Sequence, residues 1–345
     1  MQGHSTGGSV SRQPEPLVEV TRGPFVESVH LGHAVICDAQ GGIIAAWGDP
    51  QALILPRSSA KMIQALPLIE TGAARAAGLG ERELALACAS HSGAPMHTRR
   101  VAAWLTGLGL SEDDLLCGPQ MPSDPEGRAA LGDAPPGPLH NNCSGKHAGF
   151  LTVMRHLKAG PDYVDPDHPV QRAVRAAWAE ITGEEPPGHG IDGCSAPNFA
   201  GRLAGFARAM ALFARPEALG PARAAAARAL VAAMLAHPEL VAGEGRACTG
   251  LMRAAAGRAV VKTGAEGVFF AILPGRGLGV ALKIADGATR ASECAMAAIL
   301  VRLGAIDPAD PAIWRWLRRP ETNRRGIVTG EIRPAEAFYA GGAAL

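Results

Sequence analysis

The segment AVVKTGAEGVFFAILPGRGLGVALKI, residues 259–284, is the stretch that decides the fold class. It contains three apolar, β-branched runs, Ala259–Gly264, Gly267–Leu273 and Gly279–Ile284, with glycine-containing turns between them. Runs of this length joined by short turns predict antiparallel strands. A helix is expected to follow from about Ser292 to Leu303.

The N-terminal part of the chain has the same character. Short β-branched runs, separated by turn-forming residues that suit hairpins, occupy Leu17–Thr21, Val26–Val29, His33–Cys37 and Ile43–Trp47. From about residue 60 to residue 240 the pattern becomes helical, and an alanine-rich stretch within it is interrupted near Pro216. Strands at both ends therefore predict an α+β protein, in which N- and C-terminal strands form one antiparallel sheet packed with the central helices.

This pattern predicts one domain over residues 16–345, with a β-rich lobe made by both ends of the chain and a helical middle at about 60–240. Residues 1–15 are rich in Gly, Ser and His and have no periodicity, so we expect a disordered leader there.

The composition excludes several classes of function. With 345 residues, 47% of them apolar, and a net charge of +1, the chain can form a core but has no basic excess for nucleic acid or an anionic membrane. We find no apolar run suited to a transmembrane helix or a secretory signal peptide. Seven scattered cysteines fit reduced thiols better than a disulfide framework. We therefore expect a soluble, cytoplasmic protein.

Lysine is scarce, so its positions are informative. Only five of the 33 basic residues are lysine, and three of the five fall in short motifs, at Lys61, Lys146 and Lys262. Arginine stays protonated in proteins, whereas a buried lysine can become a neutral amine and act as a base or a metal ligand.

The first motif is Ser58-Ser59-Ala60-Lys61, a Ser-x-x-Lys at an expected helix start. A neutral Lys61 there could accept the Ser58 proton and make the hydroxyl a nucleophile. A strand-borne Lys262-Thr263-Gly264 about 200 residues later completes a pair typical of penicillin-recognising serine hydrolases. A clear Ser-Asp-Asn is missing between them, but Ser90, in Ala-Ser-His-Ser-Gly, could relay a proton between two lysines. A capped helix with a solvated lysine is the ordinary alternative.

Two further clusters surround cysteines. Asn141–His147 lacks the first glycine of a phosphate loop, and the Gly-x-Gly-x-x-Gly at 188–193 follows no strand, so neither predicts nucleotide binding. Cys143 and Cys194 could nevertheless meet and, with Lys146 or His147, hold a soft divalent ion such as Zn²⁺. The alternative is that both cysteines are simply buried.

Taken together and in order, six blocks resemble the thermolabile, rhizobial-type asparaginases, also called the asparaginase II or class 3 family. The resemblance extends over about residues 17 to 335. The blocks are Val20–Ser28, Arg57–Ala65, Ser90–Gly93, His140–His147, Asp192–Pro197 and Lys262–Val268.

The resemblance implies hydrolysis of L-asparagine to L-aspartate and ammonia, a fold like serine β-lactamases and penicillin-binding proteins, and a homodimer. By motif, it implies Ser58 as the nucleophile with Lys61 as its base, and Ser90 with Lys262 as a second Ser-Lys pair.

The resemblance also implies a zinc ion that aids substrate binding or structure rather than generating a nucleophilic hydroxide. Its ligands would be Cys143, Lys146 and Cys194, with His147 and Asp192 beside them as substrate-binding residues.

Three points stay open. Thr263 departs from the residue usual in the family, which leaves substrate choice open. A β-lactamase-like hydrolase or esterase of the same fold is one alternative, and a non-catalytic zinc protein with a redox-sensing cysteine pair is another.

Overall fold

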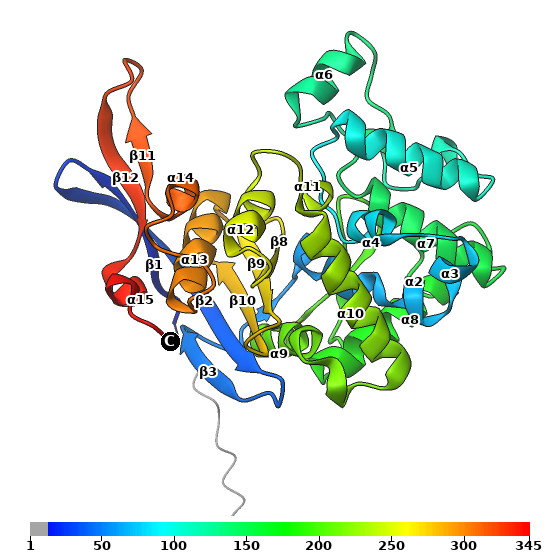
Figure 1. The fold of residues 1–345 in the computed structure, drawn as a ribbon, viewed down its shortest axis with the longest axis horizontal. Coiled ribbons are helices and arrows are strands. Elements are labelled where there is room, and N and C mark those ends of the chain that lie inside the picture. Colours follow the sequence, from blue (N-terminus) through cyan, green and yellow to red (C-terminus); the bar gives the residue numbers. More distant parts are fainter. Residues whose placement is uncertain (1–12) are drawn as a thin grey trace, which may run out of the picture.

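One antiparallel sheet of eight strands organises the protein (Figure 1). The computed structural model describes residues 13–345. The strand order is β11-β12-β1-β2-β10-β9-β8, with β3 paired to β2 outside that path. The strands are β1 (Glu15–Arg22), β2 (Phe25–Asp38), β3 (Ile43–Trp47), β8 (Val260–Thr263), β9 (Val268–Leu273), β10 (Leu278–Ile284), β11 (Arg319–Thr322) and β12 (Val328–Pro334).

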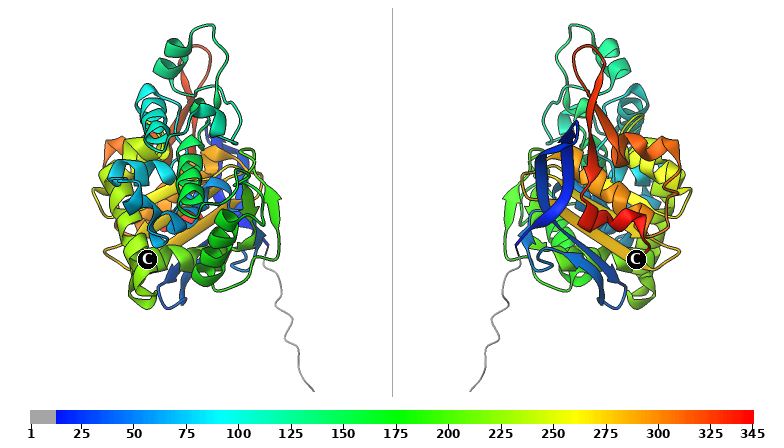
Figure 2. Two further views of the ribbon diagram at one scale, coloured as in Figure 1. Left: turned by 90° about the vertical axis from the view of Figure 1, so that its right-hand side faces the viewer. Right: turned by 90° about the vertical axis from the view of Figure 1, so that its left-hand side faces the viewer.

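The two ends of the chain meet in this sheet, as the sequence predicts. β1 pairs with β12, and β2 pairs with β10. The right-hand view of Figure 2 shows the N-terminal hairpin in blue beside the C-terminal strands in red. The β11–β12 hairpin was not predicted. Most of the expected leader lies outside the described residues, and β1 begins at Glu15.

The long strand β2 corrects one prediction, because the sequence suggested two strands with a turn before His33. Its first part pairs with β1 and its last part with β10 and β3. The change of partner falls near Gly32, where a Cβ atom would lie 2.6 Å from the Lys283 carbonyl oxygen and 2.8 Å from the Leu17 side chain. The glycine therefore permits a close strand approach and does not form a turn.

Helices pack against this sheet. α9 contacts β2, β9 and β10, and α13 contacts β1, β9, β10 and β12. Phe206 of α9 stacks on Phe270 of β9 at a centroid distance of 5.3 Å. The helices bordering the sheet are α9 (Leu203–Ala214), α12 (Ala247–Ala255), α13 (Thr289–Arg302), α14 (Trp314–Leu317) and α15 (Glu336–Tyr339).

The remaining helices form the helical middle of the chain, on the right of Figure 1. The alanine-rich stretch forms α9 and α10, and Pro216 lies in the break between them as expected. Within residues 13–345, no helix has the length and apolar character to cross a membrane. The helices are α1 (Lys61–Gln64), α2 (Leu66–Glu70), α3 (Ala73–Ala76), α4 (Glu81–Ala87), α5 (Pro95–Gly107), α6 (Pro125–Leu131), α7 (Ser144–His156), α8 (Pro169–Thr182), α10 (Pro221–Ala236) and α11 (Pro238–Val241).

Several short elements lie between the sheet and the helices. A 3₁₀ helix, η1 (Arg57–Ala60), packs against β8 and β9. A small hairpin, β5 (His189–Ile191) with β6 (Pro197–Phe199), presents its turn nearby, and β4 (Leu53–Ile54) pairs with β7 (Gly201–Arg202). Of these elements, η1 and the β5–β6 turn line the pocket described next.

Candidate active site

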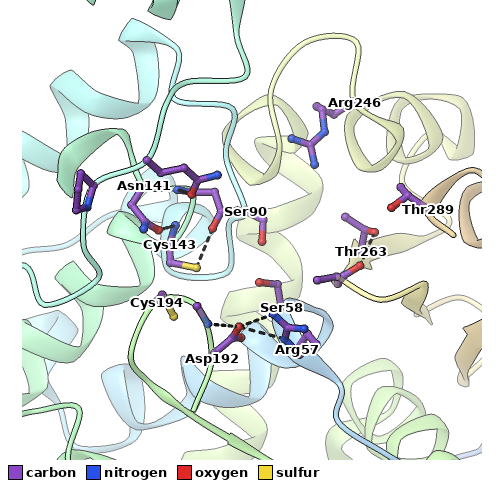
Figure 3. A pocket seen from close by; sticks show the side chains of 16 residues that line it. Arg57, Ser58, Ser90, Asn141, Cys143, Asp192, Cys194, Arg246, Thr263 and Thr289 are labelled. Carbon is purple, nitrogen blue, oxygen red and sulfur yellow. Dashed lines mark hydrogen bonds and ion pairs between the residues drawn. The ribbon is translucent and has the colours of Figure 1, made fainter. Parts of the chain in front are cut away.

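A pocket of about 400 Å³ brings most of the predicted site residues together (Figure 3). It is formed where η1, the loop after α4, the start of α7, the β5–β6 turn and the end of β8 converge. Its lining includes Ser58, Ser90, Cys143, Asp192 and Cys194. Residues far apart in the sequence therefore share one site.

Ser58 lies in η1 at the edge of this pocket and is partly exposed. The residue before it, Arg57, has a φ of +53°. A left-handed conformation at a non-glycine residue costs about 1–3 kcal/mol and is concentrated at functional sites. The N-cap of η1 is Pro56, and Ser59 is buried and donates to the Val268 carbonyl oxygen at 3.2 Å.

Gly264 lets β8 approach this serine turn. A Cβ atom on Gly264 would lie 2.7 Å from Ser59 Oγ, 2.8 Å from the Pro56 carbonyl oxygen and 3.0 Å from the Ser59 nitrogen. Two of these neighbours are backbone atoms, which cannot move aside without shifting η1. The glycine after Lys262-Thr263 thus sets the position of Ser58 relative to β8.

We predict that Gly264→Ala lowers activity by about 10²-fold while the protein still folds, because a displacement near 1 Å at a catalytic group has an effect of that order. The measurement is turnover together with the unfolding temperature. Gly188→Ala is the matched control, since a Cβ atom there meets nothing within 4 Å. Equal activities in the two variants would show that the close approach does not position the serine.

Ser90 is held between two buried lysines. Lys61 Nζ lies 3.0 Å and Lys262 Nζ 2.8 Å from Ser90 Oγ. Both lysine side chains have no exposed surface. The Ser90 backbone N–H is fixed by the Val241 carbonyl oxygen at 2.9 Å. The expected contact between Ser90 and Lys262 is thus present, across 172 residues of sequence.

Lys61 has other hydrogen-bond partners than Ser58, the serine for which it was expected to act as base. Within residues 13–345 it makes no hydrogen bond to Ser58, and its amine donates to Ser90 and to the carbonyl oxygens of Ala89 and Asn142. An ammonium group has three N–H donors, and these three acceptors match them. The Lys61 amine is therefore held by Ser90 and two carbonyl oxygens in this structure.

Lys262 is placed to exchange protons at neutral pH. Its amine donates to Ser90 and, at 2.6 Å, to the Thr263 carbonyl oxygen. Burial lowers the pKa of Lys262 to about 7, and the positive charges of Lys61 and Arg246 act in the same direction. Burial disfavours the charged form of an amine, so a neutral base is available near pH 7.

Asp192 and Arg57 form an ion pair on one wall of the pocket. Arg57 donates to one Asp192 oxygen through Nε at 3.1 Å and through Nη2 at 2.8 Å, and both side chains are largely buried. Burial alone would raise the pKa of Asp192, but the Arg57 hydrogen bond and the charges of Lys146 and Arg57 outweigh it and lower the pKa. Asp192 is thus a carboxylate facing the pocket, as a substrate-binding role requires.

Cys143, Lys146 and Cys194 converge as predicted. Lys146 Nζ lies 3.1 Å from Cys194 Sγ, and both cysteines line the pocket. The pKa of Cys194 lies well below its usual value, mainly because the Cys143 thiol forms a hydrogen bond with it. The positive charge of Lys146 lowers this pKa further. Burial would lower the pKa of Lys146, but the Cys194 charge reverses the shift and raises it. These opposite shifts favour a thiolate at Cys194 and an ammonium at Lys146.

His147, the other expected substrate-binding residue, lies outside the pocket lining. It has no exposed surface, and its Nδ1 lies 2.9 Å from the Tyr163 hydroxyl, with Phe150 also in ring contact. Position 147 comes four residues after Cys143, so the two side chains start from the same side of α7, and the buried Nε2 of His147 has no hydrogen-bond partner among the described residues. Of the two expected substrate-binding residues, Asp192 lines the pocket and His147 lies behind its lining.

The pocket also contains residues that the motifs did not indicate. Arg246, which precedes α12, and Thr289, the first residue of α13, both line it. Their elements reach the pocket only through the tertiary fold. The arginine lies after a Gly-Glu-Gly sequence, and that turn signal was the only local sign of a functional loop.

Two pocket-lining serines and two buried lysines define a candidate serine hydrolase site. The family model of L-asparaginase II matches residues 18–334. The chain belongs to the L-asparaginase II family, which places it among the amidohydrolases. No curated protein matches.

Solved structures similar to this chain include a protein from Mycobacterium bovis and one from Bacteroides dorei. A β-lactamase from Mycobacterium bovis is 15% identical, with a TM-score of 0.42, over 78% of this chain and 93% of that one. A protein from Bacteroides dorei, classed provisionally as a β-lactamase, is 10% identical, with a TM-score of 0.42, over 74% of this chain and 87% of that one. We draw no conclusion about chemistry from similarity at this level.

Proposed function

We propose that this protein hydrolyses L-asparagine to L-aspartate and ammonia through an ester on Ser58. The observation that carries the proposal is the pocket itself, in which Ser58 and Ser90 share a lining and Ser90 contacts two lysines. Membership of the family supplies the substrate class.

The proposed reaction begins with proton removal from Ser58. Ser90 and neutral Lys262 form the relay that receives this proton, with Lys61 holding Ser90 in place. The Ser58 Oγ then bonds to the side-chain amide carbon, and the Ser58 backbone N–H stabilises the oxyanion. The N–H groups on either side of it, of Arg57 and Ser59, already donate to Asn198 Oδ1 and to the Pro56 carbonyl oxygen. The C–N bond breaks as the relay returns a proton to the leaving nitrogen, which departs as ammonia. Water then cleaves the β-aspartyl ester and restores Ser58.

We also propose that Cys143, Lys146 and Cys194 hold a zinc ion. Cys194 contacts both the Lys146 amine and the Cys143 thiol, so two sulfur atoms and an amine are a suitable donor set once Cys143 and Lys146 have lost their protons. Within residues 13–345, no group of three or more His, Cys, Asp or Glu side chains is placed for a metal, so the lysine is essential to this proposal. A bound zinc ion would supply a Lewis acid beside the substrate pocket.

The proposed function is tested by ammonia release from L-asparagine, L-glutamine and a chromogenic β-lactam. We expect release from L-asparagine and no opening of the β-lactam. Hydrolysis of the β-lactam without release from either amide would overturn the proposal in favour of the β-lactamase-like alternative.

We predict that kcat/KM rises through about pH 7 and reaches a plateau above it, because Lys262, with its pKa near 7, becomes a neutral base as the pH increases. The pH profile of the purified protein measures this. The expected optimum is thus close to neutral rather than strongly alkaline. A profile whose rising limb keeps its midpoint in Lys262→Met would assign the limb to another group.

We predict about one zinc ion per chain in the purified protein and loss of most of it in Cys143→Ser and Cys194→Ser, since each variant removes a sulfur donor. Elemental analysis measures the content. Cys37→Ser is the control, because Cys37 is a buried thiol of β2 that contacts the Ala204 carbonyl oxygen instead. Equal zinc content in all four proteins would refute the assigned ligands.

A further inference from the structure

Arg246 is a cation without an ion-pair partner in a pocket whose other charged residues, Arg57 and Asp192, pair with each other. Within residues 13–345, the Arg246 guanidinium forms no hydrogen bond or ion pair, although it lines the pocket and is partly buried. Arg57, by contrast, is committed to Asp192. An arginine has five N–H donors that match a carboxylate in a planar fork.

Arg246 and Asp192 lie on different sides of the pocket, and Asp192 is the one next to Ser58. Figure 3 shows the guanidinium pointing into the pocket on the side of Thr263 and Thr289, whereas Asp192 lies on the other side, next to Ser58. A ligand with its amide at Ser58 can therefore present a cationic group to Asp192 and an anionic group toward Arg246.

The surroundings favour an anion at this place. Arg246 precedes α12 and contributes to the low pKa of Lys262. Thr289 is the first residue of α13, and its hydroxyl can donate to the same anion. Asp192 is the one acidic residue in the pocket lining, and Glu293 of α13, behind the lining, is a carboxyl on which the charge of Arg246 acts. Burial raises the pKa of Glu293, so it neutralises Arg246 less than an exposed carboxylate would, and an anionic ligand group can still bind there.

We propose that Arg246 binds the α-carboxylate of the substrate, while Asp192 receives its α-ammonium group. This inference rests on the proposed function, because it assigns the two ends of the amino acid that the pocket would hold. Arg246 is accordingly a specificity-determining residue, which selects α-amino acid amides over simple amides.

Three substrates separate the two ends of the molecule. L-asparagine carries both groups, 3-aminopropanamide lacks the carboxylate, and succinamic acid lacks the amine. We expect Arg246→Gln to raise KM by roughly 10- to 100-fold for L-asparagine and succinamic acid, the usual effect of losing a charged hydrogen bond. With 3-aminopropanamide, a poor substrate throughout, the same variant should match the wild type. Arg246→Lys should restore part of the affinity.

The control is Arg253→Gln, which removes an exposed arginine of α12 paired with Glu244, outside the pocket. It should leave all three substrates unaffected. An equal loss on L-asparagine and 3-aminopropanamide in Arg246→Gln, or no change on L-asparagine, would overturn the inference while leaving the proposed function in place.

Binding of L-aspartate, measured by calorimetry, needs no turnover and separates the two proposals. Weaker binding by Arg246→Gln supports the carboxylate contact whether or not ammonia is released. Unchanged binding in that variant, or no binding by the wild type, refutes it. Failure of the wild type to release ammonia from L-asparagine would refute the proposed function instead.

Discussion

Replacement of Ser58 by alanine is expected to abolish ammonia release from L-asparagine, with a loss on the order of 10⁴-fold or more, as for removal of other serine nucleophiles. The loss should appear in kcat, because no ester can form. Folding should be preserved, since Ser58 makes no side-chain hydrogen bond within residues 13–345 and lies at the pocket surface. Initial-rate measurement with purified protein at matched zinc content tests this.

The adjacent Ser59 provides a close control. Its hydroxyl points away from the pocket to the Val268 carbonyl oxygen, which also accepts from the Gly264 N–H at 2.8 Å. Ser59→Ala therefore leaves no unpaired carbonyl and should retain activity within a few-fold. If Ser59→Ala were inactive and Ser58→Ala active, the assignment of the nucleophile would be wrong.

Replacement of Lys262 by methionine should produce the second large loss, about 10²- to 10⁴-fold in kcat, the usual contribution of a general base. Methionine keeps the apolar stem but removes the amine that contacts Ser90. Because a buried amine is costly to desolvate, the variant should be as stable as the wild type or more so. Steady-state kinetics and thermal unfolding on the same sample separate the two effects.

Lys283→Met is the matched control for this substitution. Lys283 lies in β10, is partly buried, and donates to the Glu266 carbonyl oxygen outside the pocket lining. Activity near the wild-type value is expected there. An active Lys262→Met, or an equal loss in both variants, would show that Lys262 is not the base.

Much of the sheet could be predicted because its strands are short, apolar and separated by turns. β8, β9 and β10 follow the runs in residues 259–284 within one or two residues. The turn predicted before His33 is absent, because Gly32 there allows the backbone of Lys283 in another strand to approach closely. A single sequence does not distinguish that use of glycine from a turn.

The site was predictable as a set of residues but only partly as a set of contacts. Ser58, Ser90 and Cys194 do line one pocket, and Lys262 does reach Ser90. The choice of Lys61 between two serines depends on which carbonyl oxygens its long side chain can also reach, and this is a tertiary property.

His147 and Arg246 show that membership of a motif does not decide which residues line the pocket. His147 was expected to contact substrate, yet it lies behind the pocket lining, where its ring contacts Tyr163 and Phe150. Arg246, outside every motif, reaches the pocket through the loop before α12. Neighbourhood in sequence is a weaker guide to a site than the face on which an element presents each side chain.

The most direct test of the Ser58 mechanism is to trap the covalent intermediate. An L-aspartate β-ester with a good leaving group should make acylation fast, so that the β-aspartyl enzyme accumulates before an acid quench. The account predicts one added β-aspartyl group, located on Ser58 by peptide mass spectrometry and absent in Ser58→Ala. Turnover of that ester with no added mass, or with the group on Ser90, would contradict it.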